Sequence, residues 1–306
     1  MTLIISNCSK RKRAPLDPTL RAGGLAKDSV DAVATAWGEC LKAATSTTAA
    51  EDLYAGRAFN EAASTASILG ARLAIVSAGL GLVDGATLAP GYSLTTARRD
   101  PDNILAKTGG SASEWWMSLQ ARSPYRSTAI EEEGGLILAA LSSSYVAMIA
   151  DEWSLWPVER KARLRLFTKE EPQGASNDLR KTWMPYDDRL DALGNGHAGT
   201  QSDFAQRALR HFATTVGDTG ALEDDRAAVL RSLQGLKPRE VPTRTRSTDD
   251  QIKNLIQADW ETVSGRSGAM LRHLRDTLGV ACEQGRFKGL FGQVAKEREG
   301  ARDEGA

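Results

Sequence analysis

Short apolar runs alternate with longer amphipathic stretches along most of the chain. Residues 2–6 (TLIIS) are apolar and β-branched and lead directly into polar residues, a pattern that predicts a buried strand. Further strand patterns cover residues 72–77, 135–141 and 162–167. Apolar residues recur at helical spacing over residues 27–44, 57–69, 143–153, 201–214 and 221–233. Strands and helices in this alternating order predict an α/β fold with a mostly parallel sheet flanked by helices.

The composition changes near residue 240, where we place a domain boundary. Residues 235–247 contain two prolines and few apolar side chains, as linkers do. The pattern beyond the linker predicts three short helices over residues 249–263, 267–278 and 283–297, followed by a charged, frayed tail. The sequence therefore predicts an α/β domain over 1–240 and a small helical module, similar to a helix-turn-helix unit, over 241–306.

Charge and hydropathy exclude several classes of protein. The 306 residues include 39 basic and 39 acidic side chains, so any site for a polyanion must come from local clustering. The longest apolar runs fall far short of the roughly 20 residues that a membrane span requires. The chain starts apolar and turns basic only at residues 10–13, the reverse order of a signal peptide. We expect a cytoplasmic protein that does not enter a membrane.

Neither the cysteines nor the histidines form a metal-binding or disulfide pattern. The chain has three of each, widely separated: Cys8, Cys40 and Cys282, and His197, His211 and His273. His197 lies in a glycine-rich loop that suits closure over a ligand, whereas the other two histidines fit ordinary helix positions. We expect free thiols, no metal site and no cofactor.

A polar and basic loop follows the first predicted strand. It places Asn7, Ser9, Lys10 and Arg11 at the carboxyl end of that strand, where α/β proteins bind ligands. Hydroxyl, amide and cationic groups at this position suit a phosphate or an extruded nucleotide. A solvated basic turn explains the same residues equally well.

A glycine-rich segment follows the second predicted strand. Ser77, Gly79 and Gly81 allow the backbone to approach a ligand closely, and Tyr92 suits stacking on a base. The segment lacks the Gly-Lys-Ser/Thr ending of a Walker loop. A tight connection without a ligand is the alternative interpretation.

Motifs in this region resemble the DUF6884 family and, more distantly, the peroxide stress protein YaaA family. They are residues 7–10 (NCSK), 53–57 (LYAGR), 76–83 (VSAGLGLV) and 90–92 (PGY), in the order of the family. The resemblance implies an α/β core like that of uracil-DNA glycosylases and of tRNA-guanine transglycosylase relatives, which handle nucleobases. By analogy with relatives in phage defence, it also implies a DNA glycosylase that excises modified bases from phage DNA. The Gly-x-Asp-Pro-Tyr and His-Pro-Ser loops of uracil-DNA glycosylases are absent, so uracil specificity is not implied.

Two adjacent carboxylates are the candidate catalytic groups. Asp187 and Asp188 lie beside an aromatic residue and an arginine. Breaking an N-glycosidic bond develops positive charge on the sugar, and a carboxylate can stabilise that charge or activate water. Asn7 is expected to hydrogen-bond the base or the water. A turn after proline with two solvated acids is the alternative.

These residues combine into a working hypothesis for DNA processing. The nucleotide is extruded into a pocket between the loops after the first and second strands, where Tyr54 or Tyr92 stacks on the base. Five cations are expected to bind phosphates: Lys10, Arg11, Arg57, Arg98 and Arg99. Four more in the C-terminal module suit the DNA backbone, although a solvated helical face explains them equally well: Arg272, Arg275, Arg286 and Lys288. The expected partner is phage DNA with modified bases. The alternatives are a non-catalytic DNA-binding regulator or defence-system subunit and, less favoured, a hydrolase of free nucleosides or nucleotides.

Overall fold

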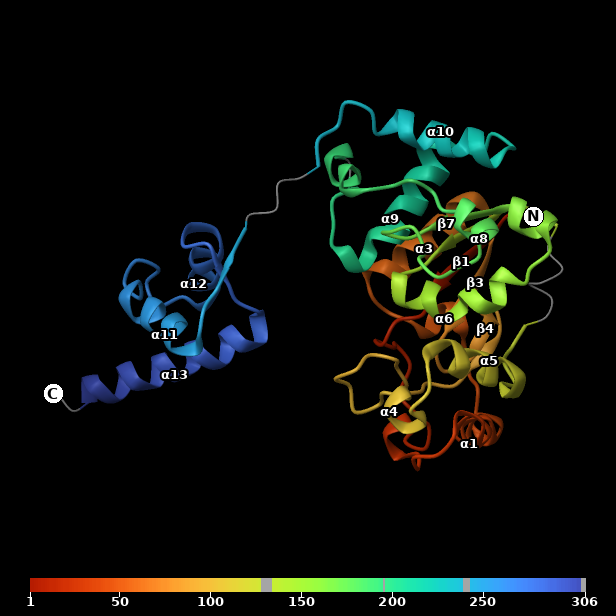
Figure 1. Ribbon diagram of the computed structural model, residues 1–306. Coiled ribbons are helices and arrows are strands. Elements are labelled where there is room, and N and C mark those ends of the chain that lie inside the picture. Colours follow the sequence, from red (N-terminus) through yellow and green to blue (C-terminus); the bar gives the residue numbers. More distant parts are fainter. Residues whose placement is uncertain (128–133, 195, 239–242, 304–306) are drawn as a thin grey trace. The chain divides into compact units, whose positions relative to one another are not determined.

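The chain forms two compact units, residues 1–239 and 240–306, in the computed structural model (Figure 1). The structure describes residues 1–127, 134–194, 196–238 and 243–303. Each unit encloses its own cluster of buried apolar side chains, as an independent domain does. No helix in these described ranges combines the length and the apolar character needed to cross a bilayer.

The larger unit is built on a five-stranded, mostly parallel sheet in the order β4-β3-β1-β6-β7. The strands are β1 (Leu3–Asn7), β3 (Arg72–Ser77), β4 (Gly81–Asp84), β6 (Ile137–Ala140) and β7 (Leu164–Phe167). β1 pairs in parallel with β3 and β6, and β6 pairs in parallel with β7, whereas β4 is antiparallel to β3. The side chains of β6 are buried throughout, which explains its continuous apolar run. Those of β7 are buried as well, and its one charged residue, Arg165, pairs with Asp225 at 2.6 Å. The predicted α/β fold with a mostly parallel sheet is confirmed.

Helices cover the sheet. They are α1 (Val30–Ala43), α2 (Ala50–Leu53), α3 (Arg57–Leu69), α4 (Leu105–Thr108), α5 (Ala112–Arg122), α6 (Ser143–Ser154), α7 (Val158–Ala162), α8 (Asn177–Lys181), α9 (Phe204–His211) and α10 (Leu222–Ser232). α3 leads into β3, and α6 connects β6 to β7 in the opposite direction across the sheet. Right-handed connections in opposite directions place these two helices on opposite faces of the sheet. A separate two-stranded pair joins β2 (Thr48–Ala49) to β5 (Leu88–Ala89).

Both outer strands of the sheet are hydrogen-bonded on their free side by other parts of the same unit. On β7, the amide of Leu166 donates to the carbonyl of Thr182 at 2.9 Å, and its carbonyl accepts from the amide of Met184 at 2.9 Å. On β4, the amide of Leu82 donates to Gln120 Oε1 at 2.9 Å, and its carbonyl accepts from the amide of residue 127 at 2.9 Å. The backbone groups at these two edge positions are therefore satisfied.

The glycine-rich segment after β3 forms a hairpin and the edge strand β4, not the expected loop. At Gly79, a Cβ atom would collide with the ring of Tyr92, and at Gly81, which has φ +84°, it would collide with Gln120 Oε1. These glycines therefore make room for neighbouring side chains of the same unit.

Gly79→Ala should lower the free energy of unfolding by about 1–3 kcal/mol, because the added methyl group forces the buried ring of Tyr92 to move. Urea denaturation measures the change. Gly24→Ala is the matched control, since nothing lies within 4 Å of a Cβ atom at Gly24. Equal losses in the two variants would contradict this explanation.

The smaller unit is mainly helical. Its elements are β8 (Thr245–Arg246), α11 (Asp249–Ala258), α12 (Ser267–Arg272), a π-helical turn (His273–Thr277), β9 (Val280–Ala281) and α13 (Gln284–Asp303). Thr248 caps α11 in a capping box with Gln251. The three predicted helices are present. The last of them, α13, continues to Asp303, so the prediction of a frayed tail is wrong for residues 297–303, and residues 304–306 lie outside the described residues. Residues 245–246, expected to be linker, instead form a parallel strand pair with residues 280–281.

Candidate functional site

The carboxyl ends of β1 and β6 lie side by side where the connections of the sheet diverge. The chain leaves β1 toward β3 on one side and leaves β6 toward β7 on the other. α/β sheets bind ligands at such a switch point. Asn7 ends β1 here, and its Oδ1 accepts hydrogen bonds from the amide of Ser142 at 3.1 Å and from Gln206 Nε2 at 3.3 Å. The structure therefore holds the Asn7 side chain in position at this switch point, but Asn7 does not line either of the cavities described below, which lie at the ends of β6 and β7 and not between the loops after β1 and β3 as predicted.

A cavity of about 200 Å³ opens at the ends of β6 and β7. Its lining residues are Leu141, Ser142, Ser143, Lys169, Gln201, Ser202, Phe204 and Ala205. Asp188 contacts two of them: it accepts a hydrogen bond from Lys169 Nζ, and one from Gln201 Nε2 at 3.3 Å. The bond from Lys169 holds the pKa of Asp188 below its usual value. An ionised, half-exposed carboxylate therefore lies beside this cavity.

Asp187, the other candidate acid, has a different environment. Its carboxylate accepts hydrogen bonds from Arg189 Nε at 2.9 Å and from the Arg189 amide at 2.9 Å. Burial raises the pKa of Asp187, but the interactions with Arg189 outweigh burial and hold that pKa below its usual value. Asp187 caps a 3₁₀ helix over Asp188–Leu193. Of the two acids, Asp188 is the one in contact with the cavity lining.

The prediction that Tyr54 or Tyr92 stacks on a base is wrong, because both side chains are buried. Both side chains are 0% exposed, so neither ring has a face open to a ligand in this structure. The Tyr54 hydroxyl lies 3.0 Å from that of Tyr92 and donates to Ser77 Oγ at 3.1 Å. Burial raises the pKa of both phenols, which therefore stay protonated. The two tyrosines are core residues beneath the crevice.

Ser77, Gly79 and Gly81 are likewise structural rather than ligand-facing. The hydroxyl of Ser77 is fully buried and accepts hydrogen bonds from the amide of Gly79 at 3.3 Å and from the amide of Leu80 at 3.0 Å. At Gly79 the ring of Tyr92 fills the space beside the backbone, and at Gly81 the side chain of Gln120 does so. The prediction that these three residues contact the substrate is wrong, because protein atoms fill the space that a ligand would need.

One cation of the basic loop, Lys12, points toward the ring of Tyr92, although it was not among the predicted site residues. Lys12 Nζ lies 4.0 Å from the ring centroid of Tyr92, a cation–π contact. Burial lowers the pKa of the Lys12 ammonium group. Nearby, Cys8 Sγ lies 3.0 Å from the hydroxyl of Tyr145 on α6. The basic run at residues 10–13 marks this loop, but nothing in the run distinguishes the half-buried Lys12 from its exposed neighbours.

Two of the five predicted phosphate-binding cations, Lys10 and Arg57, and the neighbouring Ser9 make contacts within the unit. Lys10 pairs with Asp100, which holds the pKa of Asp100 below its usual value. Arg57 pairs with Asp203 at 3.1 Å. The hydroxyl of Ser9 donates to backbone carbonyls, including that of Arg11 at 2.7 Å. Lys10 and Arg57 thus bind a phosphate only in competition with a carboxylate.

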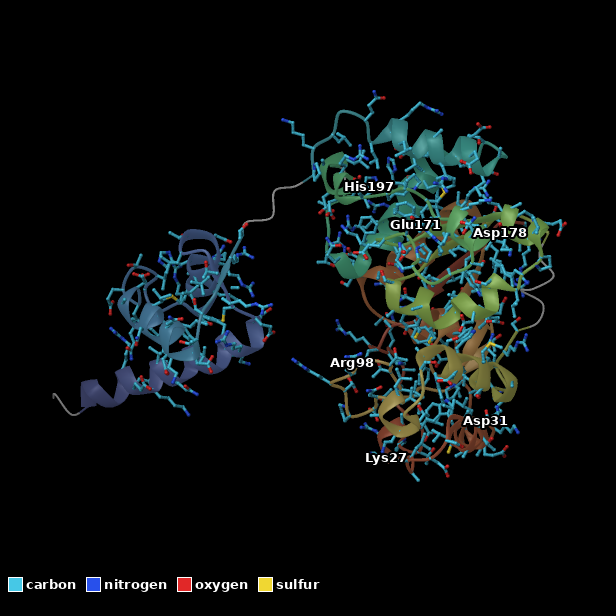
Figure 2. The ribbon with its side chains drawn as sticks, viewed as in Figure 1. Lys27, Asp31, Arg98, Glu171, Asp178 and His197 are labelled. Atoms are coloured by element: carbon cyan, nitrogen blue, oxygen red, sulfur yellow. The ribbon has the colours of Figure 1, made fainter. Side chains whose placement is uncertain are left out.

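The other three predicted phosphate ligands are exposed. The guanidinium groups of Arg11, Arg98 and Arg99 have no hydrogen-bond or ion-pair partner among the described residues, and Figure 2 shows Arg98 extending from its loop. An exposed guanidinium group keeps all five donors available for phosphate oxygens. These arginines remain the most accessible candidates for contact with a DNA backbone.

A buried arginine that the sequence did not reveal organises the segment carrying Asp188. Arg207 of α9 is 1% exposed and donates to Asp203 Oδ1 at 2.8 Å and to Asp191 Oδ1 at 2.6 Å. It also donates to the carbonyl of Thr200 at 3.0 Å. These bonds span residues on both sides of the candidate site, so Arg207 fixes the positions of Asp188 and its neighbours.

His197 is packed inside the unit and does not lie on an open loop. It is 8% exposed, and its ring meets that of His211 edge-on at 5.2 Å. His211 Nδ1 lies 2.9 Å from the hydroxyl of Tyr186. Burial lowers the pKa of His211 to about 4, and the neighbouring His197 adds to this shift. The expected closure of His197 over a ligand is corrected, because the ring already packs against protein.

The depressed pKa of His211 predicts a loss of stability in acid. The folded state favours the neutral ring, so this stabilisation is complete above about pH 6.5 and is lost as the pH falls toward 4. The contribution of His211 to the loss should be about 2 kcal/mol at about pH 5. Urea denaturation at about pH 7.5 and pH 5 measures it, and His211→Asn should reduce the difference by that amount. Identical pH dependence in the two proteins would refute the assignment.

In the smaller unit, two of the four predicted DNA-binding residues line an arginine-rich cavity of about 730 Å³. Arg275 and Arg286 lie there with Arg244 and Arg246, which belong to the segment predicted to be a linker. Arg275 donates to the carbonyl of Cys282 at 2.7 Å, so part of its guanidinium group is already occupied. The remaining predicted contacts, Arg272 and Lys288, are exposed outside this lining.

Comparisons with protein-family models, with curated proteins and with solved structures gave no significant match. The resemblance to the DUF6884 family therefore stays a prediction. Within the described ranges, no three His, Cys, Asp or Glu side chains are grouped so as to hold a metal ion.

Proposed function

We propose that the protein is a cytoplasmic DNA glycosylase that hydrolyses the N-glycosidic bond of a modified base in phage DNA and leaves an abasic site. The observation that carries this proposal is the ionised carboxylate of Asp188 beside a cavity at the carboxyl edge of a mostly parallel sheet. The α/β core agrees with the uracil-DNA-glycosylase-like fold that the family resemblance implies.

The reaction breaks the bond between sugar C1′ and the base nitrogen, and the electron pair leaves with the base. Positive charge then develops on the sugar, where the carboxylate of Asp188 stabilises it. Water adds to C1′ and loses its proton to the carboxylate, the departing base takes up a proton from solvent, and the carboxylate then returns its own proton to solvent. Lys169 and Gln201 hold this carboxylate in place, and Lys169 also supplies a cation for an adjacent phosphate. The reaction needs no cofactor, and the nucleotide must leave the base stack to reach the crevice.

Incubation with DNA that carries unmodified, hydroxymethylated or glucosylated cytosine tests the proposal. Mass spectrometry measures released base, and alkaline cleavage measures abasic sites. We expect release from at least one modified DNA and none from unmodified DNA. DNA binding without release from any substrate would refute the glycosylase proposal and favour the second candidate.

The second candidate is a non-catalytic DNA-binding regulator or defence-system subunit, which the arginine-rich cavity of the smaller unit favours. The side chain of Arg246 is exposed at this cavity, and its guanidinium group has no hydrogen-bond or ion-pair partner among the described residues. If this candidate holds, Asp188→Asn should not change DNA affinity, whereas Arg246→Ala should weaken binding and reduce its salt dependence by about one counterion. Lys253→Ala is the control, since Lys253 lies outside the cavity lining and pairs with Asp250.

A further inference from the structure

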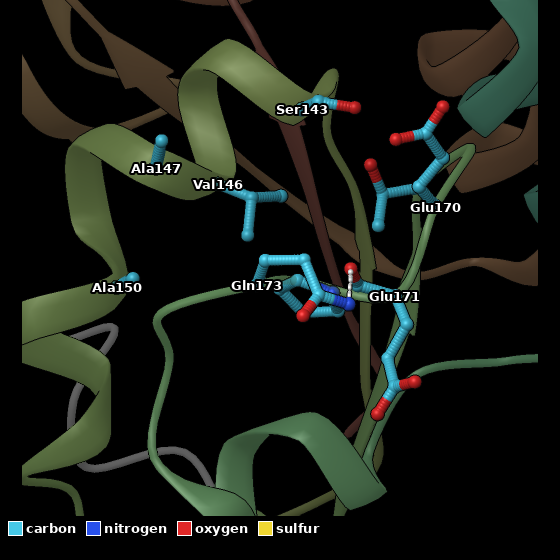
Figure 3. Close-up of a pocket in the computed structure, with 9 residues that line it drawn as sticks. Ser143, Val146, Ala147, Ala150, Glu170, Glu171 and Gln173 are labelled. Atoms are coloured by element: carbon cyan, nitrogen blue, oxygen red, sulfur yellow. Dashed lines mark hydrogen bonds between the residues drawn. The ribbon is translucent and has the colours of Figure 1, made fainter.

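A second cavity of about 200 Å³ lies next to the candidate site in the larger unit (Figure 3). It lies between α6 and the segment that follows β7, and it shares Ser143 with the cavity beside Asp188. Its lining residues are Ser143, Val146, Ala147, Ala150, Thr168, Glu170, Glu171, Pro172 and Gln173. A ligand that extends past Ser143 therefore reaches both cavities.

Thr168 carries an unsatisfied buried hydroxyl in this second cavity. The residue is 1% exposed, and its Oγ1 has no hydrogen-bond partner among the described residues. Its carbonyl is satisfied, because it accepts a hydrogen bond from Trp183 Nε1 at 3.1 Å. Buried polar groups in native proteins are nearly always paired, so an unpaired one that lines a cavity indicates a ligand with a complementary polar atom.

The walls of the second cavity combine a flat apolar surface with negative charge. Val146, Ala147 and Ala150 come from one face of α6, since they are separated by helical spacings. In Figure 3 the Glu170 carboxylate lies on the same side of the cavity as the Ser143 hydroxyl, whereas the Glu171 carboxylate points away. Glu170 has no partner among the described residues.

Apolar walls next to a carboxylate favour one class of ligand in the second cavity. Apolar walls suit a flat ring, and a carboxylate can only accept hydrogen bonds. The negative charge disfavours phosphate and the acceptor edge of uracil or thymine. We propose that the second cavity binds a nucleobase with an exocyclic amino group, of the cytosine or adenine class, with its ring against α6. The inference rests on the proposed function, because it makes this cavity the recognition pocket for the excised base.

Nucleoside binding to the full chain tests the inference separately from catalysis. The probes are 2′-deoxycytidine and 2′-deoxyuridine, which differ in this exocyclic group, and NMR titration measures their affinities. We expect deoxycytidine to bind at least about tenfold more tightly. Glu170→Gln should reduce the difference in affinity between the two nucleosides, because the amide of glutamine can donate a hydrogen bond to a uracil oxygen whereas a carboxylate cannot. Equal affinities for the two nucleosides, or no binding of deoxycytidine, would overturn the inference.

Two variants probe the cavity itself. Thr168→Val keeps the shape of the side chain and removes the orphan hydroxyl, so it should weaken deoxycytidine binding about three- to tenfold and leave the free protein equally or more stable. Ala147 is exposed at the cavity, so Ala147→Leu should fill it and abolish binding without unfolding the protein. Ala36→Leu, at an exposed position on α1, is the matched control. A loss of stability in Thr168→Val together with unchanged binding would assign the hydroxyl a purely structural role.

The two proposals fail in different ways. Binding of deoxycytidine without base release from any DNA would leave the pocket assignment standing and refute the glycosylase. Base release at full rate in Ala147→Leu would leave the glycosylase standing and refute the pocket.

Discussion

Asp188→Asn should reduce base release from modified DNA by at least about 100-fold while leaving DNA affinity within about twofold. The neutral amide can neither stabilise positive charge on the sugar nor accept a proton from water. The ion pair with Lys169 is half-exposed on the carboxylate side, so its loss should cost less than about 1 kcal/mol of folding stability. Single-turnover release assays measure the rate, and thermal unfolding checks the fold.

Asp187→Asn is the matched control for this prediction. Asp187 has the same side chain one residue earlier, but its carboxylate is bonded to Arg189 and not to the cavity lining. We expect base release to fall by less than about tenfold. Equal losses in the two variants would show that the catalytic group is not Asp188 alone.

Arg207→Met should lower the free energy of unfolding by about 3–5 kcal/mol, the largest stability change that we expect. The change leaves the buried carboxylate of Asp203 and that of Asp191 without their shared cation. It also removes the donor to the carbonyl of Thr200. Urea denaturation measures the loss, and base release should fall as well, because the segment with Asp188 loses its anchor.

Two comparisons make the Arg207 prediction specific. Lys42→Met removes an exposed ion pair with Glu39 and should change stability by less than about 0.5 kcal/mol. Adding Asp203→Asn to Arg207→Met should recover part of the loss, because it removes a buried charge that is then paired only by the exposed Arg57. A cost below about 1 kcal/mol for Arg207→Met would mean that water screens this network.

Periodicity predicted the four parallel strands and most of the longer helices of the larger unit, because each buries one continuous surface, but it missed the helix α5. The expected strand at 72–77 and helix at 57–69 match β3 and α3 residue for residue. The strand β4 was missed because the glycines around it indicate a loop. Their small size instead accommodates Tyr92 and Gln120, which come from distant parts of the chain.

The candidate site was only partly predictable, because its residues come from four separate segments of the sequence. Asn7 and Asp188 stood out through their local motifs. No sequence motif marks Lys169 or Gln201 as a site residue. They contact Asp188 only because the fold brings the end of β7 and the segment before α9 next to it. The burial of Tyr54 could not be predicted either, since tyrosine suits both a core and a binding surface.

The hydrogen bonds on the outer sides of β4 and β7 also limit how this protein can associate with others. A sheet with open edges can be extended by a strand from a second molecule, which leads to dimers, filaments or aggregates. Here the backbone groups of Leu82 and Leu166 are already bonded by Gln120 and by the segment around Thr182. Partners of the larger unit are therefore disfavoured from adding a strand at these positions. We therefore expect partners of the larger unit to contact its helices and loops rather than to extend its sheet.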